Sequence, residues 1–210
     1  MQPLYQKALK WEPALNGIFE QIIRLLPENL REHVSDRVAV GMVFTSEHFG
    51  PTCQRSADRR YYAITLHSDY LDLISKLNKY SAAIHNPNCI LRDARTKSYT
   101  TQDIVEAYNK TFEKYCSNRK LTGIKIALDP SSTEALTFTL SIYICFVFTL
   151  GHELAHIVLH HLDSHYGRVG DSDEEDIAFE KITSNWGIEY QADLIGYIIA
   201  YRFAKRYFKQ

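Results

Sequence analysis

The sequence has no excess of charge of either sign. Its 210 residues include 24 Lys and Arg against 25 Asp and Glu, which gives a formal net charge of −1. A nucleic-acid-binding surface needs clustered Lys and Arg that this balance does not supply. We therefore expect a near-neutral soluble protein with no nucleic-acid partner.

Cysteines are few and far apart. The four of them, at positions 53, 89, 116 and 145, form no CxxC pair, and none lies near the motif described below. Structural zinc sites usually have four protein ligands and favour cysteine, so such a site is not indicated. The first residues, 1–7, lack a basic segment followed by an apolar run, so we find no signal peptide. We expect reduced cysteines and a cytoplasmic location.

The sequence also lacks an apolar run long enough to cross a bilayer. The uncharged stretch 135–150 has 16 residues, whereas a membrane-spanning helix needs about 20. Apolar and polar residues alternate from Leu136 to Phe146, which is a strand signal. A capping box at Ser131 and Glu134 and the absence of a turn before His152 favour a helix instead. We predict a buried central helix and no membrane partner.

Hydrophobic periodicity along the chain predicts an α+β fold that is predominantly helical, with a small sheet beside a long helix. Helices are expected over 1–35 (punctuated at Pro13 and Pro27), 71–84, 100–115, 131–162 and 184–207, strands over 38–44, 61–66 and 123–128, and loops over 46–60 and 163–181. We predict that 121–210 forms the functional core, and that 1–120 is part of the same domain or an extension of it.

The strongest functional signal is H-E-x-x-H, formed by His152, Glu153 and His156. Positions i and i+4 of a helix lie on one face, so the two imidazoles can bind one metal ion. Glu153 can then reach a water molecule on the same side. Zinc lowers the pKa of such a water, and the carboxylate takes its proton. We therefore predict one Zn²⁺ per chain, with Glu153 as the catalytic base.

Glu189 is the predicted third ligand. It begins the pattern E-x-x-x-D on the predicted last helix, which places Glu189 and Asp193 on one face. Glu189 can bind the metal while Asp193 accepts a hydrogen bond from a ligand imidazole and fixes its tautomer. The metzincin pattern fails, because positions 159 and 162 are both Leu.

Other histidines are weaker candidates. His160 would lie two turns beyond His152, too far along one helix to share its ion. His161 is expected to point elsewhere on the helix, and His165 has no supporting partner. Zinc peptidases often use a Tyr, His or Arg to stabilise the oxyanion, but spacing distinguishes none of the possible residues here: His160, His165, Tyr166, Tyr190 and Arg202.

Gly151-His-Glu-Leu-Ala-His156 followed by Glu189-Tyr-Gln-Ala-Asp193 resembles the gluzincin metallopeptidases. Among them, the sequence is most similar to the small ImmA/IrrE-like and Lit-type phage-exclusion peptidases, over roughly residues 140–200. The resemblance implies His152, His156 and Glu189 as ligands and Glu153 as base. It also implies that an edge strand binds the substrate backbone, for which 61–66 or 123–128 could serve.

Two functions fit these residues. The first is a zinc-dependent metallopeptidase that hydrolyses peptide bonds of an intracellular protein by metal-activated water. The alternative is a catalytically inactive binding or regulatory protein on a gluzincin scaffold. The complete ligand set and the intact Glu153 favour the enzyme.

Overall fold

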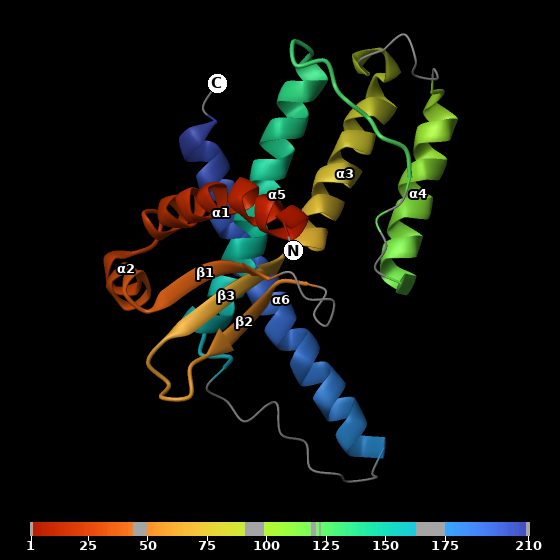
Figure 1. Cartoon of the computed structure of the whole chain (residues 1–210). Coiled ribbons are helices and arrows are strands. Elements are labelled where there is room, and N and C mark those ends of the chain that lie inside the picture. Colours follow the sequence, from red (N-terminus) through yellow and green to blue (C-terminus); the bar gives the residue numbers. More distant parts are fainter. Residues whose placement is uncertain are drawn as a thin grey trace. The chain divides into compact units, whose positions relative to one another are not determined.

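The computed structural model describes residues 2–43, 50–90, 99–118, 121, 123–162 and 175–208, with side chains described from residue 13 onward in the first helix and from 186 onward in the last. The elements, labelled in Figure 1, are α1 (Gln2–Ile23), α2 (Glu28–Ser35), β1 (Val38–Val43), β2 (Thr52–Arg55), β3 (Tyr62–His67), α3 (Ser68–His85), the short 3₁₀ helix η1 (Pro87–Cys89), α4 (Thr101–Asn118), α5 (Thr133–Val158) and α6 (Glu175–Tyr207). Helices dominate and the strands form one small mixed sheet, which confirms the predicted α+β fold.

The chain forms two compact units. Unit 1 comprises 1–43, 51–66 and 146–210, and unit 2 comprises 44–50 and 67–145. The boundary falls within α5, between Cys145 and Phe146. Unit 1 therefore contains the sheet, the H-E-x-x-H motif and α6.

The sheet of unit 1 has the order β1-β3-β2, so β3 is its central strand. Tyr62, Ile64 and Leu66 alternate along β3 and are buried, as expected for a strand with one face on a core. β2 runs antiparallel to β3, with Thr52 opposite Thr65. The hydroxyl oxygens of these two threonines lie 2.6 Å apart.

Helices supply the rest of the core of unit 1. α1 contacts both β1 and α6 through an apolar face with helical spacing. The buried residues of the three helices are Leu15, Ile18, Phe19 and Ile22 from α1, Phe146, Val147, Leu150, Leu154 and Ile157 from α5, and Ala192, Ile199, Ala200 and Phe203 from α6. The C-terminal half of α5 is thus held within a packed core.

Unit 2 is built on the contact between α3 and α4. Its core includes Tyr80 from α3 and Ile104 from α4, both fully buried. A capping box begins α4. The Asp103 carboxylate accepts from the Thr100 backbone N–H at 2.8 Å, and the Asp103 N–H donates to the Thr100 hydroxyl at 3.2 Å.

Two strand predictions were wrong. Residues 123–128 form no strand and contribute only an isolated bridge between Ile90 and Leu128, because this segment packs Ile126 into the helical core of unit 2. β2 lies inside the predicted loop 46–60. Its sequence, Thr-Cys-Gln-Arg, has no clear alternation, so its strand conformation depends on pairing with β3.

The predicted capping box of α5 was also wrong, although the helix itself is confirmed. The Ser132 hydroxyl, rather than that of Ser131, accepts from the Ala135 backbone N–H at 3.0 Å. Ser131 bonds the Asp129 carboxylate, and Glu134 accepts from the Asn86 side-chain amide at 2.8 Å. Because Ser131 and Ser132 are adjacent, the sequence pattern allows either of them to be the N-cap residue.

Three helix boundaries differ from prediction. α5 ends at Val158 rather than near 162, α6 begins at Glu175 rather than near 184, and α1 continues through Pro13. Residues 163–174, which hold most of the predicted loop 163–181, lie outside the described part of the chain.

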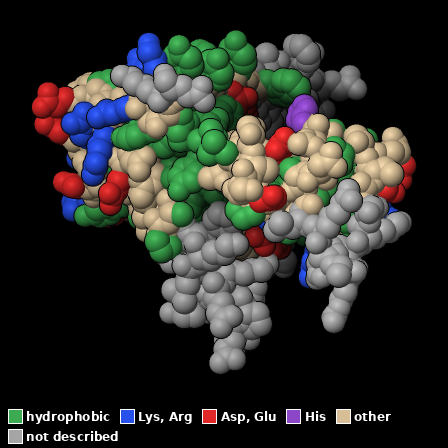
Figure 2. Space-filling model, turned by 90° about the horizontal axis from the view of Figure 1, so that it is seen from above, with side chains coloured by type: hydrophobic (Ala, Val, Ile, Leu, Met, Phe, Trp, Pro, Cys, Tyr) green, Lys and Arg blue, Asp and Glu red, His purple; other side chains and the backbone are tan. Residues whose placement is uncertain are grey.

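The N-terminal half of α5 is apolar and partly exposed. A shallow groove of about 470 Å³ in unit 2 is lined by Leu136 and Phe138 of α5, together with Lys79 of α3. Figure 2 shows hydrophobic side chains exposed on the face viewed from above. Among the described helices, α5 alone has the length and composition to cross a membrane, a test that the core helix of a soluble protein also passes. The predicted burial is therefore wrong for the N-terminal half of α5, where Leu136 is 59% and Tyr143 40% exposed.

We expect Gly123→Ala to destabilise unit 2. Gly123 has a φ of +98°, and a Cβ atom there would lie 2.5 Å from both the Thr111 hydroxyl and the Tyr80 phenol oxygen. Backbone strain and overpacking together should cost about 2 kcal/mol or more. Urea unfolding followed by circular dichroism measures the loss. Gly17→Ala in α1, where a Cβ meets nothing within 4 Å, is the control. Equal unfolding midpoints for the two variants would contradict the prediction.

Candidate metal centre

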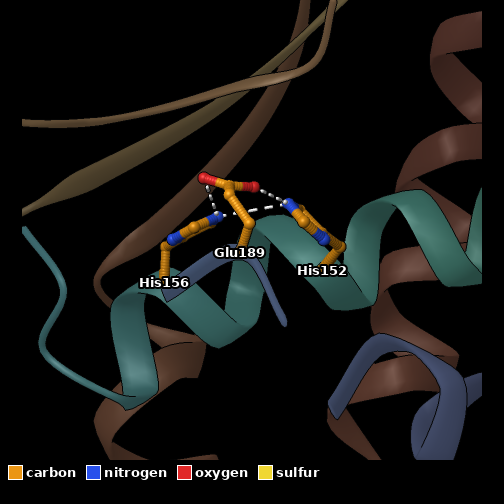
Figure 3. A group of neighbouring side chains, drawn as sticks. All are labelled: His152, His156 and Glu189. Carbon is orange, nitrogen blue, oxygen red and sulfur yellow. Dashed lines mark hydrogen bonds and ion pairs between the residues drawn. The ribbon is translucent and has the colours of Figure 1, made fainter. Parts of the chain in front are cut away.

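Two imidazoles of α5 converge on one point. His152 and His156 are one helical turn apart, and their Nε2 atoms lie 3.2 Å from each other. The ring centroids are 4.9 Å apart. Both side chains are largely buried, with 17% and 12% of their surface exposed. Figure 3 shows both rings directed toward the same side of α5. The spacing predicted from H-E-x-x-H is therefore realised.

Glu189 of α6 completes the group. One carboxylate oxygen lies 3.2 Å from His152 Nε2, and the other lies 3.8 Å from His156 Nε2. The ligand atoms of His152, His156 and Glu189 all fall within 4.8 Å of one another, so the group could hold a metal ion. At 59% exposed, Glu189 is the solvent-facing member of the group.

The spacing and chemistry of these atoms fit zinc. Zn–N bonds of about 2.0–2.1 Å in a tetrahedral site place neighbouring ligand atoms about 3.3 Å apart. The observed separations of 3.2 Å between His152 and His156 and between His152 and Glu189 match that value, and the third, between His156 and Glu189, is longer at 3.8 Å. Two imidazoles and one carboxylate also leave a fourth position open, as in catalytic zinc sites.

Asp193 supports His152 from behind. Its carboxylate oxygen lies 2.9 Å from His152 Nδ1. An acceptor at this distance holds the proton on Nδ1 and leaves the Nε2 lone pair directed at Glu189 and His156. The structure therefore places Asp193 where the E-x-x-x-D spacing put it.

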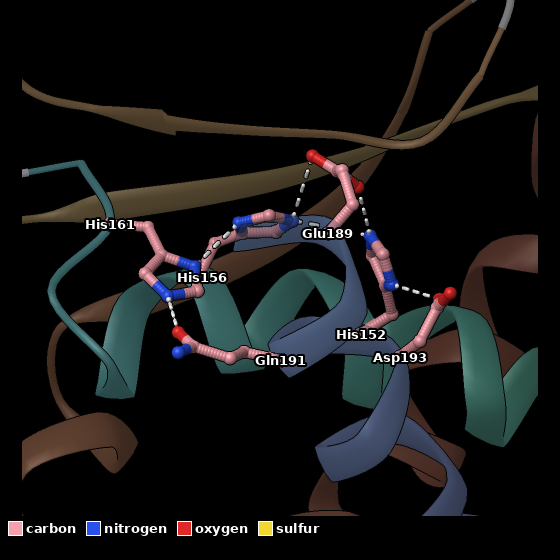
Figure 4. A network of polar contacts seen from close by, with 6 residues as sticks. All are labelled: His152, His156, His161, Glu189, Gln191 and Asp193. Atoms are coloured by element: carbon pink, nitrogen blue, oxygen red, sulfur yellow. Dashed lines mark hydrogen bonds and ion pairs between the residues drawn. The ribbon is translucent and has the colours of Figure 1, made fainter. Parts of the chain in front are cut away.

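His161 and Gln191 also join this network, and sequence reasoning missed both. His161 Nδ1 lies 3.0 Å from His156 Nδ1, and His161 Nε2 lies 3.1 Å from the Gln191 side-chain oxygen. The expectation that His161 points elsewhere on the helix was wrong, because α5 ends at Val158. Figure 4 shows the complete polar network.

A Schellman-type cap places His161. The His160 N–H donates to the Ile157 carbonyl at 3.1 Å, and the His161 N–H donates to the His156 carbonyl at 3.0 Å. His160 takes the left-handed conformation that this cap requires, with a φ of 58°. The reversal turns the chain back, so His161 lies beside His156 instead of one turn beyond it. No glycine marks this cap, which is why the helix end was misplaced.

Glu153 lies buried beside the candidate ligands, with only 7% of its surface exposed. Burial, opposed by the nearby His152 and reinforced by the Glu189 carboxylate, raises the pKa of Glu153 to about 7. Burial likewise lowers the pKa of His156, which favours the neutral imidazole that binds metals. A buried carboxyl group and a buried imidazole with shifted pKa values, side by side, are typical of functional sites.

The sheet approaches the site through Cys53 of β2. Burial, followed by the nearby Glu153 carboxylate, raises the pKa of the Cys53 thiol to about 12. The thiol therefore stays neutral. Strands pass beside the ligand side chains in Figures 3 and 4.

Two glycines allow α5 and α6 to cross closely. A Cβ atom on Gly196 would lie 3.1 Å from both the Phe148 carbonyl oxygen and the His152 backbone nitrogen. One on Gly151 would lie 3.3 Å from the Gly196 Cα. The crossing thus lies directly at His152, and it fixes where α6 presents its carboxylates. Small residues four apart on α6 (Ala192, Gly196 and Ala200) were the sequence signal for this contact.

The remaining oxyanion candidates stay unassigned. His165 and Tyr166 lie outside the described residues. The ring of His160 lies 6.4 Å from that of His33. Tyr190, 71% exposed, and Arg202 both lie on α6.

Comparisons of the chain with protein-family models, with curated proteins and with solved structures find no match. What can be said of its function therefore depends on the geometry above.

We predict that Gly196→Ala weakens metal binding. The new methyl group would meet backbone atoms of α5 that cannot rotate away, so the helices must separate by some tenths of an ångström and carry Glu189 away from His152. Isothermal titration with Zn²⁺ should show a loss of about tenfold or more, since metal sites depend on ligand position.

Gly187→Ala is the matched control for that experiment. It lies on the same helix, and a Cβ there meets nothing within 4 Å. It should leave zinc affinity unchanged and stabilise α6 by up to about 1 kcal/mol. If both variants bind zinc like the wild type, the glycine crossing does not set the ligand geometry.

Proposed function

We propose that this protein is a zinc-dependent metallopeptidase that hydrolyses peptide bonds in an intracellular protein substrate. The observation behind the proposal is the convergence of His152, His156 and Glu189 on one point, with the buried carboxylate of Glu153 next to them. Three ligands with a fourth position open, beside a carboxylate base, are the arrangement that metal-assisted hydrolysis needs.

Each side chain has a role in this proposal. His152, His156 and Glu189 would hold Zn²⁺, which when bound polarises the scissile carbonyl and makes a water molecule more acidic. Glu153 takes the proton of the attacking water and delivers it to the leaving amine. Asp193 keeps the proton of His152 on Nδ1, so that Nε2 stays free for the metal.

The sheet offers a place for the substrate backbone, though not where the sequence suggested. β3 (Tyr62–His67) is the central strand, so its backbone groups are paired on both sides, and 123–128 is not a strand. β2 is an edge strand whose Cys53 lies close enough to Glu153 for the charge of Glu153 to raise the thiol pKa. We propose that an extended peptide adds to the outer edge of β2, as in β-strand addition.

The resemblance to gluzincins supports the same proposal. In that family the third ligand comes from a helix that follows the H-E-x-x-H helix, and here α6 brings Glu189 to the two histidines and Asp193 to His152. A cytoplasmic location and the absence of nucleic-acid and membrane partners are part of the proposal, on the sequence grounds given above. The alternative function, a non-catalytic protein on this scaffold, would share the ligands but have no turnover.

We expect about one zinc per chain in protein purified without chelators or a metal-affinity tag, and a marked loss in Glu189→Ala. The variant removes one of three ligands, so affinity should fall by at least about 100-fold. Atomic emission and chelator competition measure content and affinity. Glu113→Ala, an exposed carboxylate of α4, is the control.

Full zinc in Glu189→Ala would move the third ligand elsewhere, with His165 as the next candidate. No zinc in the wild type, even after zinc is added, would overturn the enzyme proposal itself.

We expect Glu153→Gln to bind zinc normally and to lack peptidase activity, because the amide keeps the size of the side chain but cannot take a proton. Both proteins, loaded with zinc, would be incubated with a peptide library made from a digested proteome. New peptide termini, detected by mass spectrometry, should appear only with the wild type, with a rate at least about 100-fold above the variant. Equal cleavage by both proteins would overturn the role of Glu153 as base, and no cleavage by either zinc-loaded protein would favour the non-catalytic alternative.

A further inference from the structure

His156 has an unusual partner behind it. His152 has a carboxylate at Nδ1, but His156 faces a second imidazole, with 3.0 Å between the two Nδ1 atoms and 5.1 Å between the ring centroids. The other nitrogen of His161 lies 3.1 Å from the side-chain oxygen of Gln191. These three side chains form one chain of contacts in Figure 4.

The positions of hydrogens follow from this geometry. A hydrogen bond between two imidazole nitrogens needs one N–H and one lone pair. The Gln191 oxygen can only accept, so the neutral ring of His161 carries its proton on Nε2, which leaves its Nδ1 as an acceptor. His156 then donates from its own Nδ1, and its Nε2 keeps the lone pair.

The opposite arrangement would disable the site. If the Gln191 amide nitrogen faced His161, every proton in the chain would reverse, and His156 would carry a proton on Nε2. That atom lies 3.2 Å from His152 Nε2 and 3.8 Å from the nearer Glu189 oxygen. A proton on Nε2 would fill the direction from which a cation must be bound.

We propose that His161 and Gln191 are positioning residues that hold His156 in the tautomer able to bind metal. This inference rests on the metal site proposed above and assigns to it two residues outside the ligand set. α6 would then orient both ligand histidines, His152 directly through Asp193 and His156 through Gln191 and His161. The same helix supplies Glu189. Residues 189, 191 and 193 of α6 would therefore provide one ligand and the partners that orient the other two.

Four variants test the inference by zinc affinity, measured by competition with a chromogenic chelator. His161→Phe keeps a ring but removes both nitrogens, and Gln191→Leu removes the terminal acceptor. Each should weaken binding about 10- to 100-fold, the usual effect of losing a partner behind a ligand. Gln191→Glu, which can only accept, should restore wild-type affinity or exceed it. His160→Gly preserves the left-handed cap and should stay within about twofold of wild type.

A second measurement does not need metal. Nitrogen NMR of the metal-free protein, above the pH at which histidines titrate, reports which ring nitrogen carries hydrogen. His156 should be protonated at Nδ1 and His161 at Nε2 in the wild type and in Gln191→Glu. Gln191→Leu should show mixed tautomers.

Wild-type zinc affinity in His161→Phe, or equal losses in Gln191→Glu and Gln191→Leu, would overturn the inference and leave the metal site standing. A wild type with His156 protonated at Nε2 would overturn it too. If the wild type shows the expected tautomers but binds no zinc, the proposed function fails and the proton arrangement is confirmed.

Discussion

The close crossing of α5 and α6 is the constraint on which the candidate site depends. Neither helix alone holds the complete ligand set, since His152 and His156 lie on one and Glu189 on the other. At Gly196 a single added carbon would come within 3.1 Å of backbone atoms of α5, including the nitrogen of His152. Helices that pack through side chains are usually 8–10 Å apart. A glycine contact allows a closer approach, which lets a short Glu–His contact form.

The electrostatics of the site follow from that approach. Burial of Glu153 beside His152 costs free energy unless a positive charge or a hydrogen-bond donor offsets it. The raised pKa of Glu153 expresses this cost, and the lowered pKa of His156 expresses the cost of burying a charged imidazole. A divalent cation among the ligands would stabilise the ionised carboxylates and the neutral imidazoles together. The arrangement is therefore complementary to a metal ion, a property that separates it from an ordinary buried ion pair.

The sequence predicted the residues of the candidate site better than it predicted the C-terminal end of α5. H-E-x-x-H and E-x-x-x-D identified five residues that the structure brings together. Helical periodicity places positions i and i+4 of each helix on one face, and the crossing of α5 and α6 joins the two sets. The C-terminal end was misplaced because His160, rather than glycine, takes the left-handed cap position. Because the helix end was misplaced, the sequence did not predict that His161 lies beside His156. β2 was missed for another reason, because a strand with no clear apolar alternation is defined by its neighbour.

The sequence by itself determined the local features of this protein: the helix that presents His152 and His156, the pairing of Glu189 with Asp193 on a later helix, and the predominantly helical α+β composition. These depend on interactions within a few residues of each other, so periodicity records them. Only the tertiary structure decided that Glu189 reaches the histidines, that β3 is central and β2 is an edge, and that His161 and Gln191 stand behind His156. Those arrangements depend on contacts between segments distant in the chain, and no local pattern encodes them.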